Sequence, residues 1–132
     1  MRLAIFAGVA LATALAHPAI AQSRNPNSPV GTWRGTSTCL VRPSACQDEI
    51  AVYHISATKT TDSLALDGRK LVGGEEQEMG VLVCEFTAAN GQITCNIPQG
   101  VWRFTVRNDS LTGELRGRDN TRTRVVHTIR VP

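Results

Sequence analysis

The sequence predicts an all-β protein, an antiparallel eight-stranded up-and-down barrel with two local disulfides. Three observations favour this class: apolar and polar residues alternate with period two, β-branched residues are frequent, and turn-forming residues recur every 10–15 residues or so. Short connections make successive strands antiparallel neighbours. Eight such strands either leave two sheet edges bare, as in an open sandwich, or close on themselves. We favour closure because it removes the edges.

The chain has 132 residues, enough for one domain. Residues 1–21 combine a basic second residue, an apolar stretch and an Ala-x-Ala end, which is typical of a secretory signal peptide cleaved after Ala21. Residues 22–29 carry two prolines and few apolar side chains, and we expect a flexible leader there. Residues 30–132 then form the barrel domain. The expected strands cover residues 30–40, 49–59, 63–72, 78–88, 92–97, 101–107, 110–117 and 122–131.

Alternation assigns the faces of these strands. In the strand over 101–107, Trp102 and Phe104 share the apolar face, which we place inside the barrel. The last strand has an apolar face made of Val125, His127, Ile129 and Val131, with Arg122, Arg124 and Arg130 on the opposite face. Trp102, Phe104 and His127 therefore form the candidate ligand cavity. The acidic segment 73–78 is expected to be a solvated hairpin loop.

Four cysteines remain after the expected cleavage, which fits an exported, disulfide-bonded domain. They allow three pairings. We favour Cys39–Cys46 and Cys84–Cys95 because each closes a short loop, and a four-residue turn over 88–91 would set the second pair directly opposite each other. The spacings do not match the paired Cys-x-x-Cys pattern of a zinc site, so no metal or other cofactor is expected.

The charges are unevenly distributed along the chain. The overall net charge is +3, too mild to indicate nucleic-acid binding. No segment after residue 21 is apolar and long enough to span a bilayer. Outward-pointing arginines nevertheless gather on the last three expected strands, either as a solvated face or as a docking surface for an anionic envelope component. This candidate face comprises Arg103, Arg107, Arg116, Arg122, Arg124 and Arg130.

Gly31-Thr32-Trp33 at the start of the first expected strand resembles the Gly-x-Trp motif of the calycin superfamily, which includes lipocalins, avidins and small periplasmic proteinase inhibitors. The resemblance implies a Trp that plugs one barrel end and an Arg from the last strand packed on it. Trp33 matches the first role, and Arg124 or Arg130 the second. The second lipocalin motif and the avidin aromatic box are missing. The segment 31–49 is also similar to uncharacterised secreted bacterial proteins.

The sequence contains no recognisable nucleophile, metal-protease or phosphate-loop motif, so we expect no enzyme activity. The resulting hypothesis is a periplasmic or secreted binding module that holds a small apolar ligand at the barrel mouth. One alternative is a periplasmic inhibitor that binds a protein partner through the leader 22–29. A second alternative is a structural protein of the envelope.

Overall fold

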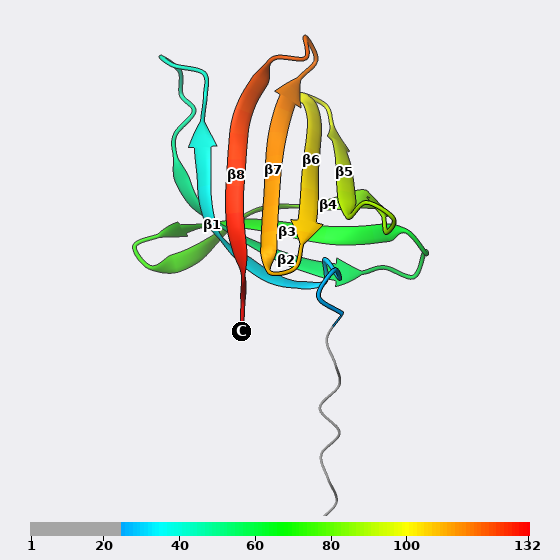
Figure 1. Cartoon of the computed structure of the whole chain (residues 1–132). Coiled ribbons are helices and arrows are strands. Elements are labelled where there is room, and N and C mark those ends of the chain that lie inside the picture. Colours follow the sequence, from blue (N-terminus) through cyan, green and yellow to red (C-terminus); the bar gives the residue numbers. More distant parts are fainter. Residues whose placement is uncertain (1–24) are drawn as a thin grey trace, which may run out of the picture.

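A computed structural model describes residues 25–132 and contains eight strands (Figure 1). The strands are β1 (Gly31–Cys39), β2 (Glu49–Ala57), β3 (Ser63–Val72), β4 (Glu75–Thr87), β5 (Gln92–Ile97), β6 (Gly100–Arg107), β7 (Ser110–Gly117) and β8 (Arg122–Val131). The expected signal peptide, residues 1–21, lies outside the described residues.

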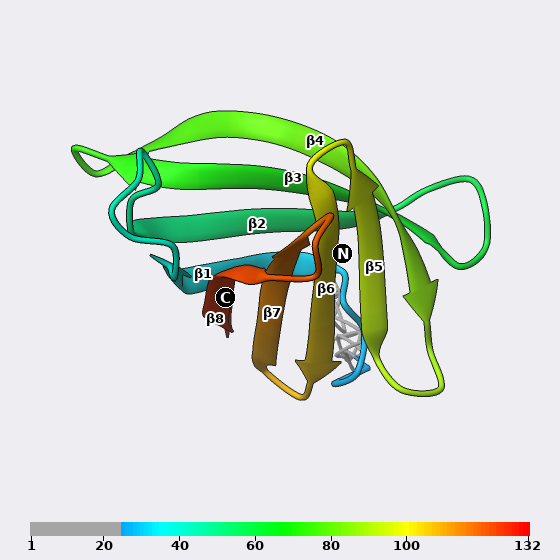
Figure 2. The ribbon, with the colours of Figure 1, turned by 90° about the horizontal axis from the view of Figure 1, so that it is seen from above.

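The strands form one closed antiparallel barrel in the order β1 to β8, and β8 pairs with β1. The predicted fold class is therefore confirmed. Strands β2–β4 run in a different direction from β5–β8, so the barrel looks like two crossed sheets when seen from above (Figure 2). The β1–β8 seam is long, from Thr32↔Val131 to Cys39↔Arg124, which leaves no bare edge there.

Strand β4 is longer than its sequence pattern indicated. It begins at Glu75, because Gly73 and Gly74 form a two-residue turn with φ of +60° and +84°, a conformation that suits glycine. The segment 73–78, expected to be a loop, is mostly strand. It forms part of a β3–β4 hairpin that extends beyond the barrel (Figure 1).

A β-bulge interrupts the β3–β4 ladder. Gly68 pairs with Gly80 whereas Arg69 pairs with Glu78, so Met79 is the extra residue on β4. The bulge reverses which face of β4 points inward. After it the even-numbered residues Leu82 and Cys84 face inward, whereas before it the even-numbered residues Glu76 and Glu78 face outward, beside Leu71 and Arg69.

Both favoured disulfides, Cys39–Cys46 and Cys84–Cys95, are present. The β4–β5 register runs from Glu85↔Thr94 to Thr87↔Gln92 across the four-residue connection 88–91. This register places Cys84 directly opposite Cys95, with Cα atoms 4.4 Å apart, as a non-hydrogen-bonded antiparallel pair should be. Both cysteines are buried in the core.

The assigned faces of the last strand are wrong. Val126 and Thr128 are buried and face the core, whereas His127 is exposed and Ile129 is 67% exposed. Arg124 and Arg130 share the inward face with Val126, because both lie near barrel ends where backbone carbonyls accept their hydrogen bonds.

Candidate functional site

Trp33 and Arg130 seal the end of the barrel at which β1 begins and β8 ends. They are paired residues of β1 and β8. Trp33 is fully buried, and the Arg130 guanidinium lies 4.2 Å from the centre of its ring, within cation–π distance. Of the two arginines that the resemblance offers for the plug, Arg130 is therefore the one on Trp33, whereas Arg124 bonds Ser37 and Gln47 at the other end.

Arg130 is 6% exposed and almost all of its donors have partners. It donates to the carbonyls of Ser28 at 2.7 Å and Val30 at 3.0 Å, and to Asp109 Oδ1 at 3.1 Å. The Trp33 indole donates to the carbonyl of Pro29 at 2.8 Å. Residues 28–29, part of the leader expected to be flexible, are therefore held against the closed end.

The opposite end contains a cavity of about 310 Å³. Most of its wall is apolar and aromatic, and its polar groups lie together where β1 ends and β2 and β8 begin, at the barrel end away from Trp33. The apolar wall includes Tyr53, Leu66, Leu82, Ile97, Trp102 and Phe104. The polar groups are Ser37, Glu49 and Arg124.

Stacked aromatic rings shape this wall. Trp102 and Phe104 lie parallel with ring centres 5.3 Å apart, and Phe104 meets Tyr53 edge-to-face at 5.5 Å. Phe104 lies over its cross-strand partner Gly113, where a Cβ would come within 2.3 Å of the ring. Gly113 therefore creates the space that Phe104 occupies.

Two of the three residues expected in the cavity, Trp102 and Phe104, line it. His127 does not, because it is exposed and points outward from β8 beside Thr112 and Thr36. Strand β8 contributes Arg124 to the cavity instead.

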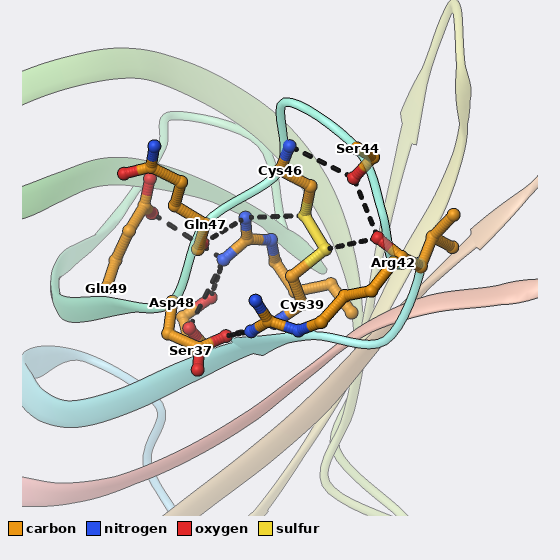
Figure 3. Close-up of polar contacts among 10 residues, drawn as sticks. Ser37, Cys39, Arg42, Ser44, Cys46, Gln47, Asp48 and Glu49 are labelled. Atoms are coloured by element: carbon orange, nitrogen blue, oxygen red, sulfur yellow. Dashed lines mark hydrogen bonds and ion pairs between the residues drawn. A yellow bond between two sulfur atoms is a disulfide. The ribbon is translucent and has the colours of Figure 1, made fainter.

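Figure 3 shows Cys46 and Gln47 of the loop over 40–48 near Ser37 and Glu49. Arg124 joins this loop to the cavity. Its Nη1 donates to Ser37 Oγ at 2.9 Å, and its Nη2 donates to the Gln47 carbonyl at 2.9 Å and faces Cys46 Sγ at 3.2 Å. Its Nη1 also lies 3.7 Å from Glu49 Oε2. Arg124 is 13% exposed, so its charge is largely desolvated and Glu49 balances it.

The six arginines of the candidate anionic-partner face do not share one surface. Arg103 and Arg107 are exposed on β6, and Arg122 is exposed at the start of β8. Arg116 is half-buried and bonds Glu114 at 2.6 Å. Arg124 and Arg130 belong to the two barrel ends, which removes them from the outer face.

A hydroxyl–imidazole–carboxylate chain, which the sequence did not indicate, crosses the outer face. Thr32 Oγ1 lies 3.1 Å from His54 Nδ1, and His54 Nε2 lies 2.8 Å from Glu76 Oε2. This order resembles an activated nucleophile. However, β1 is paired with both β2 and β8 around Thr32, so its N–H groups are used in the two ladders rather than free to bind an oxyanion. We assign these three hydrogen-bonded side chains a structural role.

Tyr53 is the only tyrosine, and its phenol is buried at the cavity. Burial raises the pKa of Tyr53 well above its ordinary value of 10.0; Glu49 adds to the rise, while Arg124 and a hydrogen bond with Ser37 oppose it.

The raised Tyr53 pKa predicts alkaline destabilisation. The neutral phenol stabilises the fold fully below pH 10, and this contribution falls by about 1.4 kcal/mol per pH unit above it, since only the unfolded chain ionises readily. Phenolate absorbance should therefore rise together with loss of near-ultraviolet circular dichroism. Tyr53→Phe should shift alkaline unfolding to higher pH. Phenolate formation in a still-folded protein near pH 10 would contradict the burial argument.

Comparisons of the chain with protein-family models, curated proteins and solved structures found no match. Within residues 25–132, no helix is long and apolar enough to cross a membrane, and no three His, Cys, Asp or Glu side chains are grouped to hold a metal ion.

Proposed function

We propose that this protein is a non-enzymatic binding module that holds a small, uncharged, amphipathic molecule in the open end of its barrel. The observation that carries the proposal is the cavity of about 310 Å³ with an aromatic wall and polar groups at its mouth. Such a combination is typical of ligand pockets. The likeness of Gly31-Thr32-Trp33 to the calycin motif supports it, because that superfamily includes ligand-binding barrels.

The cavity restricts the size of the ligand. Its volume lies at the lower end of the range of ligand pockets, roughly 300–1,000 Å³. Gly68 and Gly80 contribute no side chains to the lining, which leaves the space beside Trp102 and Leu82 open. Such a wall would accept a ligand whose apolar part is a small ring system or a short alkyl chain.

The polar groups restrict the charge of the ligand. Glu49 and Arg124 compensate each other, so an ionic ligand would lose hydration without gaining a free counter-charge. Both terminal nitrogens of Arg124 already donate, to Ser37 and to Gln47. The carboxylate of Glu49 retains acceptor capacity, because its cationic neighbours Lys70 and Arg124 are 3.8 and 3.7 Å away. A ligand hydroxyl or N–H is the group that it would accept.

Filling the cavity tests the proposal. N-phenyl-1-naphthylamine, an uncharged aromatic probe with one N–H, should bind with enhanced fluorescence. Gly68→Val should weaken that binding at least tenfold or so, because a Cβ at Gly68 meets no atom closer than 3.7 Å and the added methyls enter free space. Ala65→Val, on the outward face of the same strand, is the matched control and should bind like the parent.

Equal probe binding by the Gly68→Val and Ala65→Val variants would place the probe outside the cavity and remove the proposed function. Absence of probe binding to the parent protein would do the same. Circular dichroism of both variants verifies that the barrel is intact.

We also propose that the protein works in an oxidising compartment, since both cysteine pairs are joined. The inhibitor alternative relied on the leader 22–29, but Ser28 and Pro29 accept hydrogen bonds from Arg130 and Trp33 under the closed end. A different part of the surface offers a better protein contact.

A further inference from the structure

Strand β4 has an open edge. It has 13 residues, but only Glu85, Phe86 and Thr87 pair with β5. The Cys84–Cys95 disulfide lies where the two strands part, and from there they run in different directions (Figure 2). Within residues 25–132, the segment 75–83 has a ladder partner on its β3 side alone.

The backbone groups at this edge point outward. The N–H of Phe86 donates to the carbonyl of Asp62 at 2.8 Å, so Phe86 directs its backbone groups toward the β3 side. Successive residues of a strand alternate in this direction. Val83 and Val81 therefore direct their N–H and C=O groups to the unpaired side, where an added strand would bond them.

The side chains of the edge are unusual for an unprotected strand. Val83 is 73% exposed, Val81 55% and Met79 48%. Edges are ordinarily protected by charged side chains, proline, bulges or short length. The glutamates and the bulge at Met79 protect the first half of the segment in this way, but residues 81–83 carry none of these devices. The other half of the edge is acidic: Glu75 and Glu78 are exposed and form no ion pair with any residue of 25–132, whereas Glu76 contacts His54 and Arg69.

We propose that segment 75–83 of β4 is a docking edge for an extended segment of a partner protein, which adds to the barrel as an antiparallel strand. The partner would place β-branched residues beside Val81 and Val83, and basic residues along Glu75–Glu78. Charge complementarity identifies this occupant. Antiparallel pairing of two copies about Met79 would set Glu75 beside Val83, so the carboxylates would meet no cation.

This docking edge is independent of the proposed ligand cavity. Val81 and Val83 project from the outer face, while Leu82 and Gly80 of the same strand face inward and line the cavity. Met79 at the bulge borders both, so the variants that test the edge are placed at Val81, Glu75 and Glu78, none of which lines the cavity. Binding of the aromatic probe and binding of a peptide strand can therefore fail separately.

The test uses a fluorescently labelled, N-acetylated peptide, VTVTSKTKK, whose valines and lysines match the edge in antiparallel register. Fluorescence anisotropy should show saturable binding that weakens with added salt. The matched peptide VTVTSETEE should bind at least tenfold or so more weakly, because its carboxylates would face Glu75 and Glu78.

Two protein variants test whether the peptide binds through main-chain hydrogen bonds to the edge. Val81→Pro removes an edge N–H that has no acceptor within the barrel, and should weaken the lysine peptide about tenfold. Val81→Thr keeps the N–H and should bind within about twofold of the parent. Retained near-ultraviolet circular dichroism verifies the fold. If Val81→Pro unfolds, the double variant Glu75→Gln/Glu78→Gln serves instead and should weaken the lysine peptide about fivefold.

Three results would overturn the docking edge. One is similar affinity for the lysine and glutamate peptides. Another is the absence of saturable binding below about 1 mM, which is weaker than most specific recognition. The third is a dimer of the parent chain that Val81→Pro dissociates in sedimentation, because the edge would then belong to a second copy.

Discussion

Replacement of Arg130 by methionine is expected to lower the free energy of unfolding by about 3–5 kcal/mol. Methionine keeps much of the apolar length but leaves the carbonyls of Ser28 and Val30 and the carboxylate of Asp109 without their donor. It also removes the cation over the Trp33 ring. Urea titration monitored by circular dichroism should show this loss as a lower midpoint.

Arg103→Met is the matched control for Arg130→Met. Arg103 is exposed on the outer face of β6 and forms no ion pair with any residue of 25–132, so its replacement should change stability by less than about 0.5 kcal/mol. Arg130→Lys should lie between the two, because an ammonium keeps the charge but not the planar donor geometry. A similar midpoint for Arg130→Met and Arg103→Met would show that the closed end does not depend on the guanidinium.

Removal of the Cys84–Cys95 disulfide by Cys84→Ala/Cys95→Ala is expected to cost about 3–4 kcal/mol. The loop-entropy contribution comes from a sequence separation of 11, and the lost sulfur atoms leave space in the core. Since only three residue pairs hold β4 to β5, the barrel should open there first. Hydrogen exchange should therefore accelerate in residues 85–94 before global unfolding.

Cys39→Ala/Cys46→Ala provides the comparison for that seam. This pair closes a loop of similar size outside the barrel, so the stability cost should be about 2–3 kcal/mol. Exchange in β4 and β5 should be unchanged, because Cys46 lies in the loop after β1, away from that ladder. Uniform acceleration by both double variants would contradict the assignment of Cys84–Cys95 as the clamp of the β4–β5 seam.

Much of the fold could be predicted because local rules determine it. Four strands have the residue ranges that alternation and turn residues indicated: β3, β5, β7 and β8. The expected Cys84–Cys95 disulfide favoured a four-residue connection over 88–91 rather than a two-residue Asn90-Gly91 turn, and the register of β4 on β5 confirms it. Short hairpins make these pairings local, so the sequence contains the information directly.

Strand β8 shows why its faces could not be predicted from hydrophobicity. Its outward residues include Ile129, which is 67% exposed, and its inward residues include two arginines. Only Val126 and Thr128 reach the middle of the core. Thr128 fits there because it lies opposite Gly35 and its hydroxyl donates to the Leu111 carbonyl at 2.9 Å.

The polar part of the candidate site was also beyond the sequence. Ser37, Glu49 and Arg124 meet only when β8 pairs with β1 and closes the barrel. Arg124 lies 87 positions after Ser37 in the sequence. The bulge at Met79 has no strong local signal either, since Gly80 alone does not reveal where the ladder shifts. Long-range closure, not local preference, assembles the mouth of the cavity.

The two ends of this barrel differ, and that difference constrains how any bound ligand enters and leaves. Because Trp33 and Arg130 close one end, the barrel has the form of a cup rather than a tube. Loading and unloading must share the same rim, so a bound guest cannot be passed through from one side to the other. Release would then depend on events at the rim, where Arg124 fastens the neighbouring loop.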